Sequence, residues 1–377
     1  MIEAIFWLSA AFVFYAYAGY PLLLAAFSFF RNRPVQKGSF APKVSFIIAA
    51  YNEEKRIEDK LINTLNQVYP KERMEILVAS DCSSDKTDGI VLSYRPKGVQ
   101  LVRAPERRGK ENAQRYAVEK ASGEILIFSD VATILDPNGV AAIVRNFSDA
   151  EVGCVSSVDR FIDPDGKLTG EGAYVKYEML LRRLESRINS VVGLSGSFFA
   201  ARSAVCRDWA VDLQSDFNTL LNSIRMGLRG VADPESVGYY KNLADEGKEF
   251  ERKVRTVVRG ISVFMKSLFL LNPFRYGLFS WQLFSHKLCR WLVPFAMILG
   301  FISNGLLVSR SAFYFYALWL QVAFYAVAFG GMAAGLSSKK YYLKIPSFLV
   351  LVNLSILKAW YRYMRGERFM AWEPSKR

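Results

Sequence analysis

The middle of the chain follows the hydrophobic pattern of a protein in which strands and helices alternate. Four apolar runs of strand length occur at 44–49, 75–79, 99–103 and 124–128. Three segments of helical length lie between them, at 53–68, 85–94 and 110–121. Repeated strand–helix units predict a mainly parallel sheet with helices on both faces. We therefore expect an α/β domain over residues 41–250.

Long uncharged stretches lie on both sides of this domain. Residues 4–30, 291–309 and 311–338 form uncharged runs of 27, 19 and 28 residues, and a membrane-spanning helix needs about 20. The first run has no basic segment before it and continues past Ala16-Tyr17-Ala18, which resembles a cleavage site. This favours an anchor over a cleaved signal peptide. We expect one N-terminal span and a C-terminal hairpin of two spans.

A further apolar stretch, residues 345–357, has only 13 residues. That length is more typical of a re-entrant or interfacial segment than of a span. A basic tail follows it, and basic segments favour the cytoplasmic side. Three spans with the tail inside are therefore favoured, and a fourth span stays open.

Basic residues without acidic neighbours also follow the first span, so we expect the α/β domain to be cytoplasmic. These residues are Arg31, Arg33, Lys37 and Lys43. The pattern is that of a multi-pass protein of a bacterial inner membrane. The expected parts are a span and basic linker (1–40), the α/β domain (41–250), amphipathic interfacial helices (251–290) and a membrane region with a basic tail (291–377).

Composition and charge agree with a membrane location. Of the 377 residues, 51% are apolar and 22% charged, and the mean hydropathy is +0.12. The net charge of +14 arises late in the chain, because residues 251–377 hold 18 Lys or Arg against 3 Asp or Glu. This excess lies beside apolar stretches, which indicates a membrane surface and no nucleic-acid partner. Four separated cysteines and a single histidine exclude a disulfide scaffold and a multi-histidine metal site.

Polar residues follow each of the four predicted strands. They are Tyr51, Asn52 and Glu53, then Ser80 and Asp81, then Arg107, Arg108 and Lys110, and finally Ser129 and Asp130. Ligands of parallel sheets bind beyond the carboxyl ends of the strands, so we expect one site of mixed carboxylates and cations. No GxGxxG follows a strand and no Walker A sequence is present. The mixture suits a sugar-linked diphosphate, since carboxylates accept hydrogen bonds or hold a metal and cations neutralise phosphate.

Two segments of this domain strongly resemble the start of glycosyltransferase family 2. They are residues 44–54 (VSFIIAAYNEE) and 76–87 (ILVASDCSSDKT). Weaker matches follow at 108–113 (RGKENA), 127–130 (IFSD), 195–202 (SGSFFAAR) and 214–217 (QSDF). The membrane stretches resemble those of membrane-bound bacterial polysaccharide glycosyltransferases. The resemblance implies the GT-A fold, that of nucleotide-diphosphosugar transferases, and inverting glycosyl transfer.

The resemblance also implies roles for individual residues. The nucleotide sugar would contact Ala49, Tyr51, Glu53 and Asp81, and its pyrophosphate would lie near Lys110 and Asp130. Asp130 matches the first position of the family's Asp-x-Asp metal motif, but Ala132 replaces the second acid. A magnesium or manganese cofactor is therefore implied, with one of its two carboxylates missing. Ser195 and Gly196 would border the acceptor.

Asp216 matches the second acid of the family's paired-acid motif, and Ser215 replaces the first. As the base, Asp216 would take the proton of the acceptor hydroxyl. As a structural residue, it would cap the helix predicted to begin there.

Arg252 and Arg255 stand where processive members have Gln-x-x-Arg-Trp, with Thr256 in place of the tryptophan. They would clamp the diphosphate or touch lipid headgroups, and the sequence does not decide between these roles.

The sequence therefore predicts an inverting hexosyl- or N-acetylhexosaminyl-transferase. Its donor would be a cytosolic nucleotide-diphosphosugar, with a UDP-sugar favoured, and its acceptor a lipid-linked or polysaccharide chain at the membrane. The missing tryptophan and the few spans favour single additions. A processive synthase that elongates and extrudes a polymer is the alternative. A nucleotidyltransferase would need no spans, and a transporter would need no acid- and cation-lined edge on a cytosolic domain.

Overall fold

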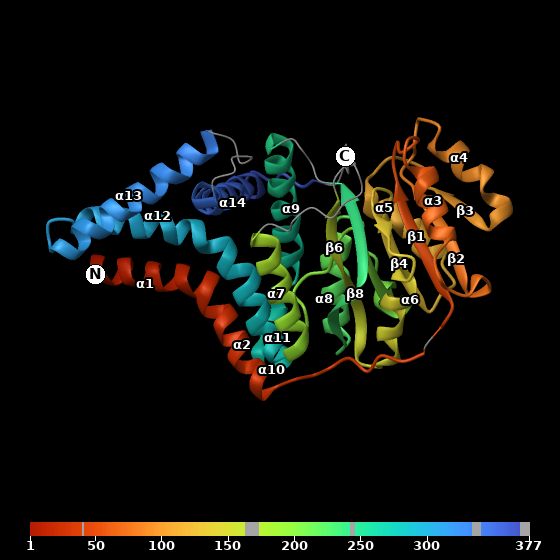
Figure 1. Cartoon of the computed structure of the whole chain (residues 1–377), viewed down its shortest axis with the longest axis horizontal. Helices are drawn as coiled ribbons and strands as arrows, with labels where there is room; N and C mark the ends of the chain where they lie inside the picture. Colours follow the sequence, from red (N-terminus) through yellow and green to blue (C-terminus); the bar gives the residue numbers. More distant parts are fainter. Residues whose placement is uncertain (40, 163–172, 242–245, 334–340, 370–377) are drawn as a thin grey trace. The chain divides into compact units, whose positions relative to one another are not determined.

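The computed structural model describes residues 1–39, 41–162, 173–241, 246–333 and 341–369. The end of the third uncharged run (334–338) and of the basic tail (370–377) lie outside these residues. The chain forms two compact units (Figure 1). The helix unit is Met1–Ala25, Ala244–Ser262 and Ser280–Arg368, and the sheet unit is Ala26–Leu243, Val263–Phe279 and Phe369–Arg377.

The sheet unit is built on one mixed sheet. Among the described residues its strands are β1 (Val44–Ala50), β2 (Met74–Ser80), β3 (Val99–Arg103), β4 (Ile125–Asp130), β5 (Ile134–Leu135), β6 (Val152–Ile162), β7 (Phe198–Arg202) and β8 (Arg229–Lys241). Their order is β3-β2-β1-β4-β7-β6-β8-β5. The four strands predicted from the apolar runs are parallel to one another. Strands β6 and β8 are also parallel, whereas β7 is antiparallel to β4 and β6 and β5 is antiparallel to β8. The sheet is therefore mixed but mainly parallel, as the pattern predicted.

Helices cover both faces of this sheet (Figure 1). They include α3 (Ile57–Leu65), α4 (Thr87–Ser93), α5 (Lys110–Lys120), α6 (Gly139–Val144), α7 (Ala173–Ile188) and α8 (Ser215–Arg225). Apolar side chains from both layers form the core; β1 is buried along its whole length. Helix α3 shows the pattern that produces this packing, because Ile57, Leu61 and Thr64 recur at three- and four-residue spacing and are all buried.

Strand register determines which loops meet at the site. Ala49 pairs with Ala79 on one side and with Asp130 on the other, so the carboxyl ends of β1, β2 and β4 are level. Because β7 runs in the opposite direction, its first residue, Phe198, pairs with Ser129. The segment just before β7 therefore lies at the same edge as Asp130.

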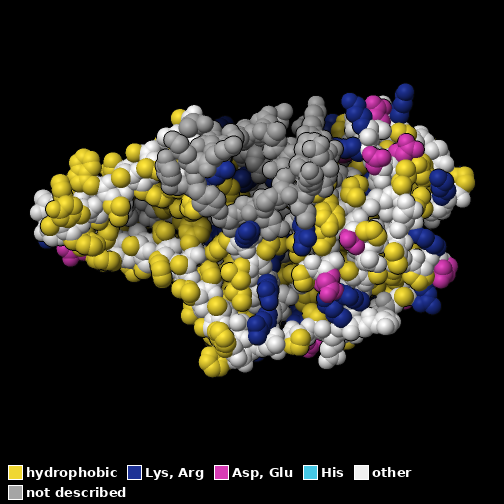
Figure 2. Space-filling model, in the orientation of Figure 1, with side chains coloured by type: hydrophobic (Ala, Val, Ile, Leu, Met, Phe, Trp, Pro, Cys, Tyr) yellow, Lys and Arg dark blue, Asp and Glu magenta, His cyan; other side chains and the backbone are white. Residues whose placement is uncertain are grey.

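Long apolar helices dominate the helix unit. The helices within it or leading into it are α1 (Ile2–Phe14), α2 (Tyr20–Phe30), α9 (Glu246–Lys266), α11 (Leu278–Leu283), α12 (Arg290–Leu307), α13 (Ala312–Ala333) and α14 (Tyr341–Met364). Within the described residues, four stretches are long and apolar enough to cross a membrane: Ile2–Phe30, Leu278–Leu307, Ala312–Ala333 and Leu343–Met364. Many of their side chains are exposed, and Figure 2 shows a largely hydrophobic surface over α1, α12 and α13.

Two π-helical turns bend the first and second of these stretches at the same level. They are Tyr15–Gly19, between α1 and α2, and Phe284–Cys289, between α11 and α12. The Tyr15 hydroxyl lies 2.6 Å from Ser285 Oγ. Ala16 packs with Cys289 and Val293 near these turns, whereas Phe6 packs with Leu307 and Tyr314 at the opposite end of the bundle.

Among the described residues, the side-chain hydrogen bonds from helix α14 to α13 and to the chain around the π turns lie at one of these ends. Ser347 Oγ donates to the carbonyl of Ala328, near the end of α13. Asn353 Nδ2 donates to Tyr17 Oη, and Trp360 Nε1 donates to the carbonyl of Trp291. Tyr17 lies in the first π turn and Trp291 just after the second.

Thirteen residues separate Ser347 from Trp360, a rise of about 20 Å along a helix. Both residues nevertheless reach the same end of the bundle, so α14 crosses that end. A Cβ on Gly331 would overlap the Ser347 side chain, so glycine permits the close approach of α13 and α14. The stretch for which the sequence left spanning and re-entrant arrangements open thus lies in a helix that is long and apolar enough to cross a membrane.

Candidate active site

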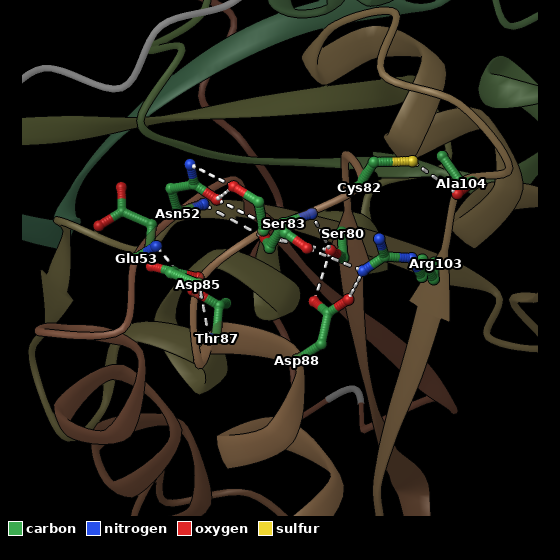
Figure 3. Close-up of polar contacts among 11 residues, drawn as sticks. Asn52, Glu53, Ser80, Cys82, Ser83, Asp85, Thr87, Asp88, Arg103 and Ala104 are labelled. Carbon is green, nitrogen blue, oxygen red and sulfur yellow. Dashed lines mark hydrogen bonds and ion pairs between the residues drawn. The ribbon is translucent and has the colours of Figure 1, made fainter.

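The loops after β1 and β2, which carry the two strongest sequence motifs, are folded onto each other (Figure 3). The backbone N–H of Asn52 donates to Ser83 Oγ at 3.2 Å, and that of Glu53 donates to Thr87 Oγ1 at 2.7 Å. Asp85 accepts the N–H groups of Glu54 and Thr87. Part of the motif therefore serves to hold one loop against the other.

Asp81 is fully buried at the end of β2 and fixes the loop before α5. Its carboxylate accepts the backbone N–H of Arg108 at 3.0 Å and that of Gly109 at 3.0 and 3.1 Å. Burial raises the pKa of Asp81, and these hydrogen bonds oppose the rise. The neighbouring Arg107 guanidinium lies 4.0 Å from the centre of the Tyr51 ring, so the aromatic face at the end of β1 is covered by a cation.

Glu53 is a second buried acid at this edge. It pairs with Arg56, whose Nη2 lies 2.6 Å from Glu53 Oε2. Burial raises the pKa of Glu53, Arg56 opposes the rise, and the negative charge of Asp130 adds to it. Glu53 and Asp130 thus lie near enough for their charges to interact.

Lys110 connects three parts of the site. Its Nζ donates to Asp130 Oδ1 at 2.5 Å and to the carbonyl of Gly196 at 3.0 Å. Lys110 begins α5, Asp130 ends β4 and Gly196 precedes β7. The backbone N–H of Asp130 also donates to the carbonyl of Ser197. The antiparallel strand β7 is what brings the Ser195–Ser197 segment to Asp130.

The Ser195–Ser197 segment is held by an acid from β6 that the sequence analysis did not identify. Asp159 accepts the hydroxyl of Ser195 at 2.7 and 2.8 Å and that of Ser197 at 2.6 Å. The backbone N–H of Ser195 donates at 2.8 Å to Ser156 Oγ, which lies three residues before Asp159 in β6. Ser195 is therefore buried and held by this network, and its position beside the acceptor stays a prediction.

Asp216 lies in the first turn of α8, and Gln214 occupies the N-cap position. Asp216 Oδ2 accepts a hydrogen bond from the side-chain amide of Gln214 at 3.1 Å. A Cβ built on Gly196 would come within 3.2 Å of the same oxygen. The start of α8 is also tied to the start of α5, since the N–H of Ser215 donates to Glu111 Oε1. Asp216 and Lys110 thus both lie against Gly196.

Lys60 is a buried cation beneath this edge that sequence reasoning missed. Its Nζ donates to Ser129 Oγ at 2.7 Å and to the carbonyl of Thr133 at 2.5 Å, one on each side of Asp130. Complete burial lowers the pKa of Lys60 to about 7. Its position in the sequence could have indicated this burial, because Lys60 falls on the buried stripe of α3 between Ile57 and Leu61.

The predicted metal position offers one protein ligand. Within the described residues no group of three or more His, Cys, Asp or Glu side chains is placed to hold a metal ion. Asp130 is the acid available, and its Oδ1 is occupied by Lys110. Magnesium and manganese keep waters and take phosphate oxygens, so such an ion fits here only with a substrate diphosphate completing its ligands.

Three predicted residues remain. Ala49 is fully buried within β1, where it pairs with Asp130. Arg252 and Arg255 lie on α9, in the helix unit, and their contact with the diphosphate stays a prediction.

The sheet topology and this cluster can be compared with known proteins. Residues 45–209 match the family model described as Glycosyl transferase family 2. This part of the chain is therefore similar to glycosyltransferase family 2. The matched residues include the β1 and β2 motifs, Lys110 and Asp130. They end before Asp216, so the assignment of the base does not rest on this match.

Curated relatives of this chain include bacterial polymer synthases. Poly-beta-1,6-N-acetyl-D-glucosamine synthase of Staphylococcus aureus is 26% identical over 237 residues, which are 60% of this chain and 56% of that protein. The synthase of the same name from Staphylococcus epidermidis is 26% identical over 178 residues, 45% of this chain and 42% of that protein. The chain thus spans about half the length of the curated relatives it matches.

Among solved structures, the mannosyltransferase PcManGT from Pyrobaculum calidifontis, in complex with GDP-Man and Mn²⁺, has a similar fold. The likeness covers 97% of this chain and 100% of that chain, with a TM-score of 0.76 and 21% sequence identity. The fold of the sheet unit is therefore the GT-A fold that the sequence resemblance implied.

Proposed function

We propose that this chain transfers a sugar from a nucleotide-diphosphosugar to a membrane-associated acceptor, with inversion at the anomeric carbon. The observation that carries the proposal is the meeting of Asp216 and Lys110 at Gly196. A carboxylate there can accept a proton, and an ammonium group there can stabilise a departing phosphate. Inverting transfer needs both groups in one site.

The reaction assigns a separate task to each of these residues. Asp216 takes the proton of the acceptor hydroxyl while its oxygen bonds to the anomeric carbon. The bond from that carbon to the diphosphate oxygen breaks in the same step, and the nucleoside diphosphate leaves with its electron pair. Lys110 offsets the negative charge that develops on the leaving group. Asp159 holds the Ser195–Ser197 segment, which supports the positions of Gly196 and Lys110.

The donor would bind along the ends of β1 and β2. The Tyr51 ring can stack on a base, which requires Arg107 to move from its face. Glu53 is an acceptor for base or ribose hydroxyl groups, whereas Asp81 already accepts two backbone N–H groups and acts through the loop that it holds. The donor nucleoside is proposed as uridine, as in the prediction from sequence.

A divalent cation would be held by Asp130 together with the donor diphosphate. Such an ion supplies positive charge to the leaving group when bound. Lys110 already supplies one positive charge at this position, so the phosphates depend less on a cation that two carboxylates would hold. The mannosyltransferase of similar fold was solved with Mn²⁺.

Two kinds of product remain to be distinguished, a singly extended lipid-linked acceptor and a polymer. Thr256 in place of tryptophan and the position of α14 across one end of the bundle favour single addition. The names of the curated relatives favour the second candidate, a processive synthase.

The test is a screen of radiolabelled nucleotide sugars against membranes that contain the full chain. Products are separated into lipid and polymer fractions, and membranes with Asp216→Asn serve as the control. We expect label from one donor in the lipid fraction, absent from the control. Label in the polymer fraction would favour the processive candidate, and no transfer from any donor would refute the proposed activity.

A further inference from the structure

A cavity of about 360 Å³ lies in the sheet unit between α8 and the chain around α10 (Pro273–Tyr276). None of the candidate site residues lines it. Its lining includes Asp208, Asn222, Arg225, Phe269, Arg275 and Tyr276. Two positive charges and one negative charge therefore face this cavity.

The two arginines are held by aromatic rings. The Arg225 guanidinium lies 5.9 Å from the Phe269 ring centre, and that of Arg275 lies 5.4 Å from the Tyr276 ring centre. The two rings are themselves 6.2 Å apart. In the described part of the chain, neither guanidinium has a carboxylate within the 4.0 Å of an ion pair. The cavity thus presents two oriented cations available to an anion.

Exposed apolar side chains occur in the cavity lining and in the segment that adjoins it. Phe274 is 100% exposed, and Leu268, Phe269 and Met226 are between 43% and 51% exposed. No acidic residue occurs from Val263 to Phe279. A fully exposed phenylalanine beside arginines is costly in water and typical of a surface that lies in the membrane interface.

The covalent connection places this segment beside the membrane. The candidate span Leu278–Leu307 begins two residues after Tyr276. Residues at the entrance to a span lie at headgroup depth, where aromatic and arginine side chains are favoured. Phosphate is the anionic group of that layer, and an arginine guanidinium binds phosphate through paired hydrogen bonds.

We propose that this cavity binds the phosphate of an anionic phospholipid headgroup, with Phe274 inserted among the acyl chains. Arg225 and Arg275 contact the phosphate, and Asn222 contributes an amide at the same wall. The inference is independent of the proposed transferase activity, because it rests on the cavity, its charges and the adjoining candidate span.

The test uses the full chain in nanodiscs with equal amounts of phosphatidylglycerol and phosphatidylcholine. The photocrosslinker p-benzoylphenylalanine replaces Phe274, and in a control protein it replaces Ile62, an exposed apolar residue of α3. We expect lipid adducts at position 274 and none at position 62. We also expect phosphatidylglycerol to be enriched in the adducts by roughly tenfold, because two cations each favour an anionic headgroup several-fold.

The headgroup contact is tested by adding Arg225→Gln and Arg275→Gln to the crosslinking protein. The enrichment should vanish while adduct formation continues, because Phe274 still inserts. The charge-matched control, Arg95→Gln with Lys97→Gln, removes two exposed cations of the sheet unit and should keep the enrichment. Equal melting temperatures of these variants show that each is folded.

Three results would overturn the proposal. They are the absence of lipid adducts at position 274, equal capture of the two lipids by the unaltered cavity, and loss of the enrichment on adding inorganic phosphate. The last would identify soluble phosphate as the ligand. A protein adduct at position 274 in native membranes, without lipid, would assign the surface to a protein partner instead.

Discussion

Three acids of the site are held in different ways, and these differences set their chemistry at the residue scale. Asp81 is buried and receives two backbone N–H groups, whereas Asp130 is held by the Lys110 amine. Asp216 accepts the Gln214 amide and lies against a residue without a side chain. Most of the residues that the resemblance identified lie at the ends of strands or in the first turn of a helix. Asp159 and Lys60 escaped notice because each reaches the site through contacts between elements far apart in sequence.

The first prediction concerns Asp216. Asp216→Asn should lower the transfer rate by about 10²–10⁴-fold, since the amide cannot take a proton. The melting temperature should change little, because asparagine still accepts the Gln214 amide and Gln214 holds the N-cap position. Asp59→Asn is the matched control, an acid in the first turn of α3. Rates and melting curves decide the matter, and near-normal turnover of Asp216→Asn would end the assignment of the base.

The second prediction concerns the divalent cation. EDTA should abolish transfer, and added Mg²⁺ or Mn²⁺ should restore it, because Asp130 and the donor diphosphate are expected to share the ion. Asp130→Ala should not be rescued by more metal. Binding of nucleoside diphosphate by calorimetry, with and without Mn²⁺, gives a readout besides activity. Full activity in EDTA would mean that Lys110 alone offsets the phosphate charge.

The arrangement of strands and helices brings the site together at the element scale. The apolar runs predicted β1 to β4, with ends within two residues of those observed. They did not reveal that β7 runs antiparallel to β4, because strand direction depends on long-range pairing and leaves no local periodicity. That reversal places Gly196 between Lys110 and Asp216. Helix α3 contributes Lys60 to the region beneath this edge, and a purely apolar helix face would not contain a lysine.

The third prediction follows from the burial of Lys60 on α3. Its pKa is about 7 in the folded chain against an ordinary 10.5. Below pH 7, Lys60 is protonated in both the folded and the unfolded chain, so the folded chain bears the full free-energy cost of burying the charge. Between these values the unfolded chain binds more protons, so stability rises with pH. Wild-type stability should therefore increase relative to Lys60→Met from pH 7 to pH 10.5, by on the order of a few kcal/mol.

Melting curves across that pH range test this, with Lys120→Met as the control for an exposed lysine of α5. The control should follow the wild-type profile. Parallel profiles for the wild type and Lys60→Met would show that Lys60 keeps an ordinary pKa.

The distribution of charge and apolar surface determines how the chain meets the membrane at the scale of the whole molecule. The sequence predicted three spans from uncharged runs, and it left α14 open because Lys344 and Lys358 shorten its uncharged core. The hydrogen bonds of α14 to Tyr17 and Trp291 show which end of the bundle this helix contacts, which composition alone does not predict. Glu251 of α9 also pairs with Lys358 and Arg362, so the end of α14 lies beside a charged helix.

The fourth prediction is a topology. A tag at residue 1 should be periplasmic, and tags near Arg95 and at the C-terminus should both be cytoplasmic, because α14 crosses one end of the bundle without traversing the membrane. Protease protection in spheroplasts and after lysis measures all three positions. Cleavage near residue 95 with the inner membrane intact would refute the orientation, and a periplasmic C-terminus would establish α14 as a fourth span.

The paired π turns at Tyr15–Gly19 and Phe284–Cys289 are the places where these helices can absorb a change of chain length. A π turn contains one residue more than the α-helical turn that it replaces, so deleting one residue from it restores regular helix. A deletion at Ala18 would therefore shorten this turn and leave Phe6 on the helix face that meets Leu307 and Tyr314. A deletion between Phe6 and Tyr15 would instead rotate Phe6 by about 100° about the helix axis. A one-residue gap in an alignment of this segment therefore preserves the helix face only when it falls within the π turn.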